Sequence, residues 1–164
     1  MRFKPQLPAA GLMGRARAAI EVPASVPDAE ALWYDLKRWP AFIDGFGHVV
    51  RDEGWPRAQG VLVWDSTPAG RGRVVERVSA QVPGQGQTAD VEDPRLAGTQ
   101  TVAFTAVDSG VGVTLSLDYR LKSGPAPLRP ILDALFIGRA IQDSLRRTLV
   151  RFGRELEADR EFGS

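Results

Sequence analysis

The chain contains no cysteine and a single histidine, His48. The lack of cysteine excludes disulfide bonds and thiol chemistry. Zinc and copper sites are built mainly from cysteine and histidine side chains, and one histidine cannot supply such a set. No Walker-type loop is present, and the two glycines of SGVGVTL lie between expected strands rather than between a strand and a helix. The sequence therefore predicts neither a metal nor another cofactor.

An excess of charge of one sign is also missing. The chain has 21 lysines and arginines against 20 aspartates and glutamates, and its formal net charge is +1. This balance, without blocks of basic residues, argues against a nucleic-acid partner. Residues 1–22 are interrupted by Pro5, Pro8, Gly11 and Gly14 and hold no long apolar run. We therefore predict no transmembrane segment and a cytoplasmic protein.

With 164 residues, 43% of them hydrophobic, the chain is large enough to bury one substantial core. We predict a single domain over residues 1–164, with a folded core at about 15–158. The composition is compatible with a monomer and with a homodimer.

Aromatic residues make up only 8% of the chain, yet five of them lie between residues 31 and 46. Ser25 is expected to cap a short helix that ends at Trp39, because Pro40 disfavours helical geometry in the residue before it. Pro40 then begins a second short helix, which carries Phe46 inward. The aromatic side chains of the two helices are predicted to form a packing cradle and one wall of a cavity.

From residue 48 to residue 122 the hydrophobic period changes to two, with glycine and proline between the runs. This pattern predicts successive antiparallel strands, with a hairpin turn at residues 108–110. A further strand is expected before the helix pair. The expected strands are ARAAIEV, VLVWDST, GRGRVVERVSAQVP, GQTADVED, TQTVAFTAV and GVGVTLSLDYRLK.

The last expected strand alternates most clearly between an apolar and a polar face. Its apolar face carries Val111, Val113, Leu115, Leu117, Tyr119 and Leu121. A helix from near residue 130 to about residue 159 follows, and its apolar stripe includes Leu135, Leu145 and Leu149. Because the apolar face of the sheet needs a cover, the predicted fold class is α+β: a curved antiparallel sheet wrapped around a long C-terminal helix, with two short helices after the first strand.

This order of elements, with LWYDLKRWPAFIDGF in the helix pair and GRVVERVSAQVP in the strands, resembles the START-like helix-grip superfamily, also called SRPBCC. Within it, the chain is most similar to the polyketide cyclase/dehydrase-like branch. The resemblance covers roughly residues 15–158. It implies a helix-grip fold with a cavity between the curved sheet and the long helix, and a small-molecule partner.

The resemblance also implies which strand residues face that cavity. By position they are Val75, Arg77, Ser79 and Gln81. Aromatase/cyclases usually have an arginine at the position of Gln81 and a tyrosine at the position of Phe46. These departures remove a fixed cation and a phenol that could polarise a carbonyl or move a proton, so they disfavour cyclase chemistry.

Two polar residues are expected on inward faces. A buried Arg77 needs an ionic partner or a ligand, and Gln142 interrupts the apolar stripe of the long helix. Each is interpreted either as part of an internal network with Asp90 or Glu92, or as a ligand contact. No residue is assigned a catalytic role, and His48 is expected either to face solvent or to have a merely structural role. The candidate ligand-binding residues are Trp39, Phe46, Val75, Arg77, Ser79, Gln81, Leu115, Leu117, Tyr119, Leu135 and Gln142.

The predicted function is binding of a small, largely apolar molecule, such as a polyketide, lipid or isoprenoid, beneath the long helix. An alternative is a polyketide cyclase, aromatase or dehydratase in which Arg77, Ser79 and Gln142 hold a folded polyketone. A third possibility is a scaffold with a filled core and no ligand. An open cavity would favour the first two functions, and conversion of a polyketone would favour the second.

Overall fold

The computed structural model describes residues 12–122 and 130–163, with only the backbone for residues 130–134. A first strand is followed by short helices, then by further strands and one long helix. In chain order the elements are β1 (Met13–Val22), α1 (Val26–Trp33), the 3-10 turn η1 (Leu36–Arg38), α2 (Trp39–Phe42), β2 (Phe46–Glu53), β3 (Val61–Ser66), β4 (Arg73–Val82), β5 (Gly86–Glu92), β6 (Leu96–Val107), β7 (Gly110–Leu121) and α3 (Pro130–Phe162).

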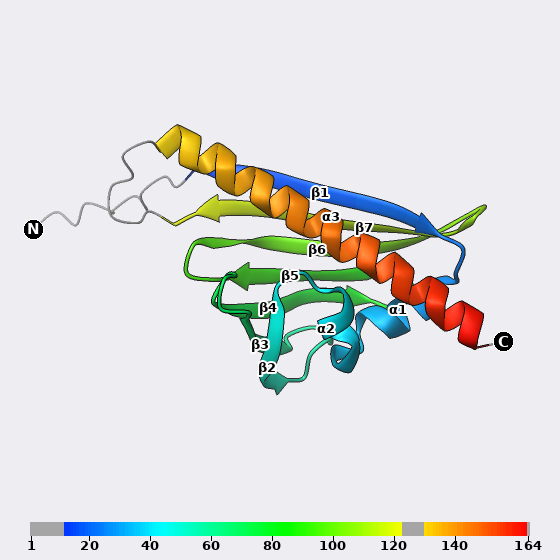
Figure 1. Cartoon of the computed structure of the whole chain (residues 1–164). Coiled ribbons are helices and arrows are strands. Elements are labelled where there is room, and N and C mark those ends of the chain that lie inside the picture. The colour runs from blue at the N-terminus through cyan, green and yellow to red at the C-terminus, as the bar shows by residue number, and fades with distance from the viewer. Residues whose placement is uncertain (1–11, 123–129, 164) are drawn as a thin grey trace, which may run out of the picture.

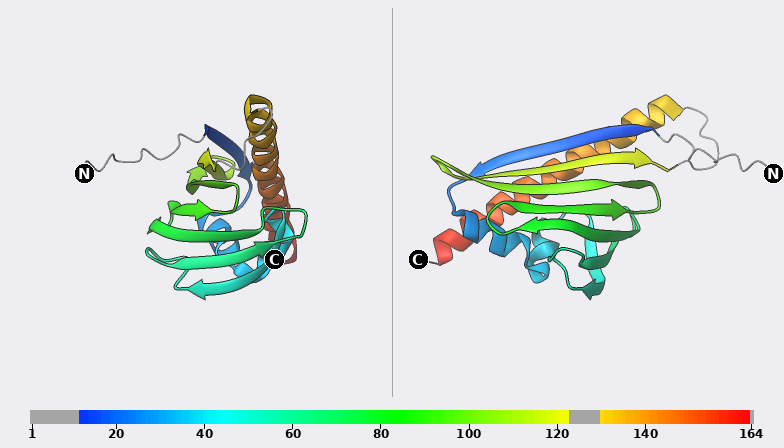
Figure 2. Two further views of the ribbon diagram at one scale, coloured as in Figure 1. Left: turned by 90° about the vertical axis from the view of Figure 1, so that its left-hand side faces the viewer. Right: turned by 180° about the vertical axis from the view of Figure 1, so that it is seen from behind.

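The strands form one antiparallel sheet in the order β1-β7-β6-β5-β4-β3-β2. Figure 1 shows α3 running diagonally across one face of this sheet, with α1 and α2 near its C-terminal half. Figure 2 shows the same layers from the side and from behind, and the sheet curves around the helix. This arrangement confirms the predicted α+β helix-grip fold.

The alternation predicted for the last strand is confirmed in β7. Val113, Leu115 and Leu117 are buried, whereas Asp118 and Arg120 on the opposite face are exposed. β7 pairs with β1 on one side and, through the predicted hairpin, with β6 on the other. Its apolar residues therefore define the inner face of the sheet, on which α3 packs.

The apolar stripe of α3 meets the sheet along the later turns of the helix. Leu145, Leu149 and Phe152 are buried, but Leu135 is exposed. The first turns of α3 lie beside the beginning of β1, which is the edge strand of the sheet (Figure 1). The expectation that Leu135 is buried is therefore wrong, because the cover that the sheet gives ends there. No helix in the described part of the chain is both long enough and apolar enough to cross a membrane.

The helix pair begins as predicted and is divided differently. The Ser25 side chain accepts a hydrogen bond from a backbone N–H of the first turn (3.2 Å) and caps α1. α1 ends at Trp33 rather than at Trp39. The reason is local: the Asp35 side chain accepts a hydrogen bond from the Lys37 backbone N–H (3.1 Å) and starts the separate turn η1, a contact that competes with continued α-helix.

The second predicted helix is also shorter than expected. α2 ends at Phe42, Gly45 takes a left-handed backbone conformation with φ of 74°, and Phe46 begins β2. The sequence pattern did not separate β2 as a strand. Register shifts interrupt its pairing with β3 at two places, and such irregularities remove the period-two alternation that marks a strand.

The aromatic residues of the helix pair pack against the second half of α3. The rings of Trp33 and Phe42 contact Phe152 with centroids 5.5 and 5.2 Å apart, and all three side chains are fully buried. Arg38 adds an ion pair with Glu155 of α3 (2.7 Å). The aromatic cluster is therefore a packing cradle for α3, as predicted.

The unequal burial along α3 predicts unequal costs of truncation. Leu149 is fully buried, so Leu149→Ala should lower the free energy of unfolding by about 2–5 kcal/mol. Leu135→Ala changes an exposed site on the same helix and should alter it by less than about 0.5 kcal/mol. Urea unfolding followed by circular dichroism measures both values, and equal losses would contradict this packing.

Candidate functional site

The pleat of β4 decides which of its side chains face α3. Val74, Glu76 and Val78 are buried on the inner face. The alternate residues point to the outer face: Val75, Arg77 and Ser79. The inward orientation predicted for these three residues is therefore wrong by one position, and a shift of one residue moves every side chain of a strand to the other face.

Arg77 lies among charged groups on the outer face of the sheet. It is paired in register with Asp90 of β5. The ion pair with Lys122 lowers the pKa of Glu92, and the charge of Arg77 adds to that effect. Arg77 therefore belongs to a solvated charge network and not to an internal one, so it is not positioned to contact a ligand beneath α3.

Gln81 is the member of the predicted set that turns toward the interior. A register shift between Val78 and Ala80 adds one residue to β4, and such a bulge reverses the alternation of the residues that follow. Gln81 is half-buried beside Tyr34. Burial raises the pKa of Tyr34 to about 12, and the Gln81 side chain opposes this rise.

A small cavity lies between the inner face of the sheet and the middle of α3. Its volume is about 40 Å³, enough for a few water-sized groups. Its lining combines aromatic and aliphatic groups with polar ones: Trp39, Trp64, Leu115, Arg71, Glu76, Gln87 and Gln100. Charged and amide side chains thus meet inside a core that is otherwise rich in aromatic residues.

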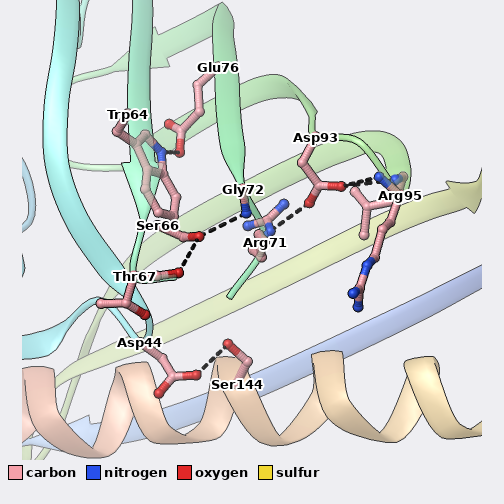
Figure 3. A network of polar contacts seen from close by, with 11 residues as sticks. Asp44, Trp64, Ser66, Thr67, Arg71, Gly72, Glu76, Asp93, Arg95 and Ser144 are labelled. Atoms are coloured by element: carbon pink, nitrogen blue, oxygen red, sulfur yellow. Dashed lines mark hydrogen bonds and ion pairs between the residues drawn. The ribbon is translucent and has the colours of Figure 1, made fainter. Parts of the chain in front are cut away.

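Glu76 places a carboxyl group in this cavity, with only 4% of the residue exposed. One of its oxygens accepts a hydrogen bond from Trp64 Nε1 (3.1 Å; Figure 3). Burial raises the pKa of Glu76 above its ordinary value of 4.5, while the Trp64 hydrogen bond and the charge of Arg71 oppose the rise. Desolvation therefore favours the neutral acid form, which can donate a hydrogen bond.

Arg71 reaches the cavity from the turn before β4. Its Nε donates to Asp93 Oδ2 (2.8 Å), and its guanidinium lies 5.9 Å from the centre of the Trp64 ring. Asp93 is almost fully buried. It also accepts hydrogen bonds from the backbone N–H groups of Arg95 (2.7 Å; Figure 3) and Leu96 (3.0 Å). The Nη2 atom of Arg71 is buried and meets no acceptor in the described part of the chain. A buried N–H group without an acceptor costs free energy, and an oxygen that accepts its hydrogen bond removes that cost.

Trp39 forms the aromatic wall of the cavity. Its Nε1 donates to the Trp33 carbonyl (2.8 Å), and its ring meets Trp64 and Phe46 edge-on, with centroids 6.3 and 5.7 Å apart. Phe46 packs behind this wall. The structure thus brings Trp39 and Leu115, two of the predicted site residues, to the cavity.

Three other predicted site residues, Leu117, Tyr119 and Leu135, lie away from the cavity. Leu117 and Tyr119 are buried further along β7, where Tyr119 lies between Gly14 of β1 and Gly138 of α3. Leu135 is exposed at the end of the sheet. These three residues are separated from the lining of the cavity.

Gln142 supports the edge of the sheet. Its amide oxygen accepts a hydrogen bond from the Arg17 backbone N–H (3.0 Å), and its amide nitrogen donates to the Arg17 carbonyl. Because β1 is an edge strand, these bonds occupy backbone groups that could otherwise pair with another strand. This geometry supports the structural interpretation of Gln142 over the ligand-contact one.

Asp44 joins the end of α2 to α3 at the solvent side of the cavity. Its carboxylate accepts hydrogen bonds from Ser144 Oγ (2.8 Å) and Arg147 Nε (3.0 Å). Its backbone N–H donates to Thr148 Oγ1 (3.0 Å). Asp44 and Arg71 are both partly exposed and both line the cavity, so its lining meets solvent on this side.

Sequence reasoning did not find Glu76 and Arg71. In RVVERVS, valines occur on both faces, so alternation alone does not choose between them. One signal was available. Val74 and Val78 flank Glu76 on one face of the strand, whereas the other face carries Arg77 and is therefore expected to be the solvent-exposed face. Arg71 lies in a glycine-rich turn, and its contact with the cavity depends on tertiary structure.

The curved antiparallel sheet, the helix across it and the cavity between them define a START-like helix-grip protein of the SRPBCC superfamily. Residues 13–157 match the family described as polyketide cyclase / dehydrase and lipid transport, and the chain belongs to that family. A comparison with curated proteins gives no match.

Solved structures share the fold at low sequence identity. A protein from Thermus thermophilus is 20% identical, with a TM-score of 0.72, over 88% of this chain and 98% of that one. The di-domain ARO/CYC StfQ from the steffimycin biosynthetic pathway is 21% identical, with a TM-score of 0.69, over 92% of this chain and 52% of that one. Truncated norcoclaurine synthase from Thalictrum flavum is 12% identical, with a TM-score of 0.65, over 90% and 96%.

The raised pKa of Glu76 predicts a pH dependence of stability. The folded state binds this proton more tightly than the unfolded chain does, so stability falls as the pH rises above about 4.5 and through the raised pKa. Glu76→Gln cannot ionise, and its unfolding free energy minus that of the wild type should grow over this window. Urea unfolding across a pH series measures it. Glu53→Gln, at an exposed site, is the control, and a Glu76→Gln difference as flat as the control would contradict the burial.

Proposed function

We propose that the protein binds a small, largely apolar molecule carrying a carbonyl or similar oxygen, in the cavity between the sheet and α3. The supporting observation is a buried donor inside an aromatic core: Arg71 Nη2 meets no acceptor in the described part of the chain. It lies in the same cavity as the Glu76 carboxyl, whose pKa burial raises. The Trp39 and Trp64 rings provide the apolar contact surface. Polyketides, lipids and isoprenoids with such an oxygen fit this chemistry, and membership of the family supports a small-molecule ligand.

The ligand must enlarge the cavity as it enters. Pockets that enclose small organic molecules measure about 300–1,000 Å³, against about 40 Å³ here. The contacts of Asp44 with Ser144 and Thr148 hold the end of α2 against α3 at the solvent side. Separation of α2 from α3 at these contacts is the movement that we expect to admit the ligand.

A scaffold with a filled core and no ligand is the competing possibility. Such a core would be expected to pair its buried polar groups internally, because each unpaired one costs free energy. The unpaired Nη2 of Arg71 is the observation that favours a ligand over a scaffold.

Two probes of matched shape test the proposal. α-Tetralone and tetralin share one bicyclic skeleton, and only the tetralone has a carbonyl oxygen. Arg71→Lys keeps a positive charge beside Asp93 but loses the second N–H group of the guanidinium. We expect it to weaken α-tetralone binding by about tenfold or more, because a charged donor is lost, and to leave tetralin binding unchanged. Isothermal titration calorimetry measures both affinities.

Arg73→Lys is the matched control. Arg73 makes the same kind of contact with Asp65 (2.8 Å), but on the surface, so this variant should bind both probes as the wild type does. If the wild type bound neither probe, the proposed function would fail. If Arg71→Lys weakened the binding of α-tetralone and tetralin equally, the protein would still have an apolar binding pocket, but Arg71 would not be the group that recognises the ligand oxygen.

One observation favours a second function, cyclisation of a polyketone. A buried carboxylic acid in its neutral form can act as a general acid. In an aldol closure, Glu76 would give its proton to the carbonyl oxygen under attack while the enol carbon bonds to that carbonyl carbon. The proton of the enol hydroxyl then returns to Glu76. Arg77 and Ser79 are not placed for this step, because they lie on the outer face of the sheet.

Because Gln81 and Phe46 replace the arginine and tyrosine usual in aromatase/cyclases, we expect the wild type to bind a synthetic linear triketone without converting it. Chromatography of the reaction mixture detects any product. Product above the uncatalysed background would establish cyclisation if Glu76→Gln abolished it and Gln142→Ala retained it. The second variant is the control, since Gln142 contacts β1.

A further inference from the structure

Three buried side-chain atoms in the described part of the chain have no hydrogen-bond partner: Arg71 Nη2, Trp55 Nε1 and the phenol oxygen of Tyr34. The proposed function uses only the first of them. Buried polar groups are rarely left unpaired in proteins, because each one costs free energy. The unpaired groups of Trp55 and Tyr34 therefore need an explanation of their own.

Trp55 lies just beyond the wall of the cavity. It belongs to the turn between β2 and β3 and is 6% exposed. Its ring meets the Trp39 ring edge-on, with centroids 5.2 Å apart. Burial raises the pKa of Glu76, and the Trp55 side chain is among the groups that oppose this rise. The indole N–H of Trp55 is therefore near the Glu76 carboxyl, which lines the cavity, without completing a hydrogen bond to it.

The turn that carries Trp55 is held by contacts on both sides. Asp52 Oδ1 accepts a hydrogen bond from the Trp55 backbone N–H (3.1 Å). The carbonyl of Pro56 accepts one from Gln87 Nε2 (2.9 Å), and Gln87 also lines the cavity. The position of the indole thus depends on groups other than its own N–H, which is left for a ligand.

Tyr34 continues the row of aromatic rings away from the cavity. Its ring meets Trp55 edge-on, with centroids 5.8 Å apart, and lies 6.3 Å from the ring of Phe104 in β6. Burial raises the pKa of Tyr34 and the nearby Gln81 side chain opposes the rise, but its amide does not complete a hydrogen bond to the phenol. The unpaired phenol and the unpaired indole N–H therefore belong to neighbouring rings.

We propose that Trp55 and Tyr34 form a second oxygen-binding subsite, so that the ligand carries an oxygen at each end of an apolar body. A ligand hydroxyl suits this subsite, because it can accept a hydrogen bond from the indole N–H and share another with the phenol. The subsite rests on the proposed function. It also gives the direction in which the cavity enlarges, from Arg71 past the Trp39 ring toward Tyr34.

Two naphthalene probes of matched shape test the subsite. 2-Acetylnaphthalene has one oxygen, and 6-acetyl-2-naphthol adds a hydroxyl at the opposite end of the same rings. Against an apolar wall, the added hydroxyl would lose its water without replacement and weaken binding. In the subsite it should instead strengthen binding to the wild type about tenfold, because unpaired groups gain a partner. Isothermal titration calorimetry measures both affinities.

Tyr34→Phe removes only the phenol oxygen. It should reduce the preference for 6-acetyl-2-naphthol to about twofold or less and leave the affinity for 2-acetylnaphthalene unchanged. Without ligand, its melting temperature should be no lower than that of the wild type, because no internal hydrogen bond is lost. Tyr119→Phe is the matched control. Tyr119 is the other tyrosine of the chain and is not part of the cavity lining, so this variant should keep the preference.

The indole N–H of Trp55 gives a second readout in a two-dimensional nitrogen–proton NMR spectrum, where its signal is assigned by its loss in Trp55→Phe. Saturating 6-acetyl-2-naphthol should move this signal downfield of its position with 2-acetylnaphthalene, because a hydrogen bond forms.

The subsite is overturned if the hydroxyl weakens binding to the wild type, if Tyr34→Phe keeps the preference, or if the Trp55 signal is the same with both probes. A lower melting temperature of unliganded Tyr34→Phe would also overturn it, since the phenol would then be paired within the protein. Binding of neither probe would overturn the proposed function together with the subsite, whereas binding of 2-acetylnaphthalene without a gain from the hydroxyl would overturn the subsite alone.

Discussion

The packing of α3 against the inner face of the sheet is the interaction on which the other features depend. Leu145, Leu149 and Phe152 face the sheet, and Trp33 and Phe42 extend the same apolar contact through the short helices. Groups enclosed by this contact lose water, which strengthens electrostatic effects inside it. The same contact also has limits, since it ends before the first turns of α3, where Leu135 and Phe136 are exposed.

Within that enclosure, the register of one strand determines the chemistry. Because Glu76 rather than Arg77 faces inward on β4, the interior holds a carboxyl group whose pKa burial raises, while the guanidinium of Arg77 remains solvated. The positive charge of the interior comes instead from Arg71, which is anchored by the buried Asp93. Arg71 Nε donates to Asp93, whereas Arg71 Nη2 is left unpaired. The bond to Asp93 therefore orients Nη2, the donor that we propose binds the ligand oxygen.

Most of the fold could be predicted from the sequence, because its signals are local. The Ser25 cap, the alternation of β7 and the apolar stripe of α3 each follow from spacing within one element. The site was only partly predictable. Trp39 and Leu115 do line the cavity, but the orientation of β4 could not be read from a segment with valines on both faces. The bulge that turns Gln81 inward and the contact between Arg71 and Asp93 both depend on partners that are distant in the sequence.

The central claim is that Arg71 and Glu76 recognise a ligand oxygen inside the enclosure. Isotope-edited infrared spectroscopy of α-tetralone labelled at its carbonyl carbon tests it most directly, because hydrogen bonds to a carbonyl lower its stretching frequency. Bound to the wild-type protein, the labelled band should lie at lower frequency than in an apolar solvent, and it should move back toward the apolar value in Arg71→Lys. A bound ligand whose carbonyl band matched the apolar solvent in both proteins would contradict the account.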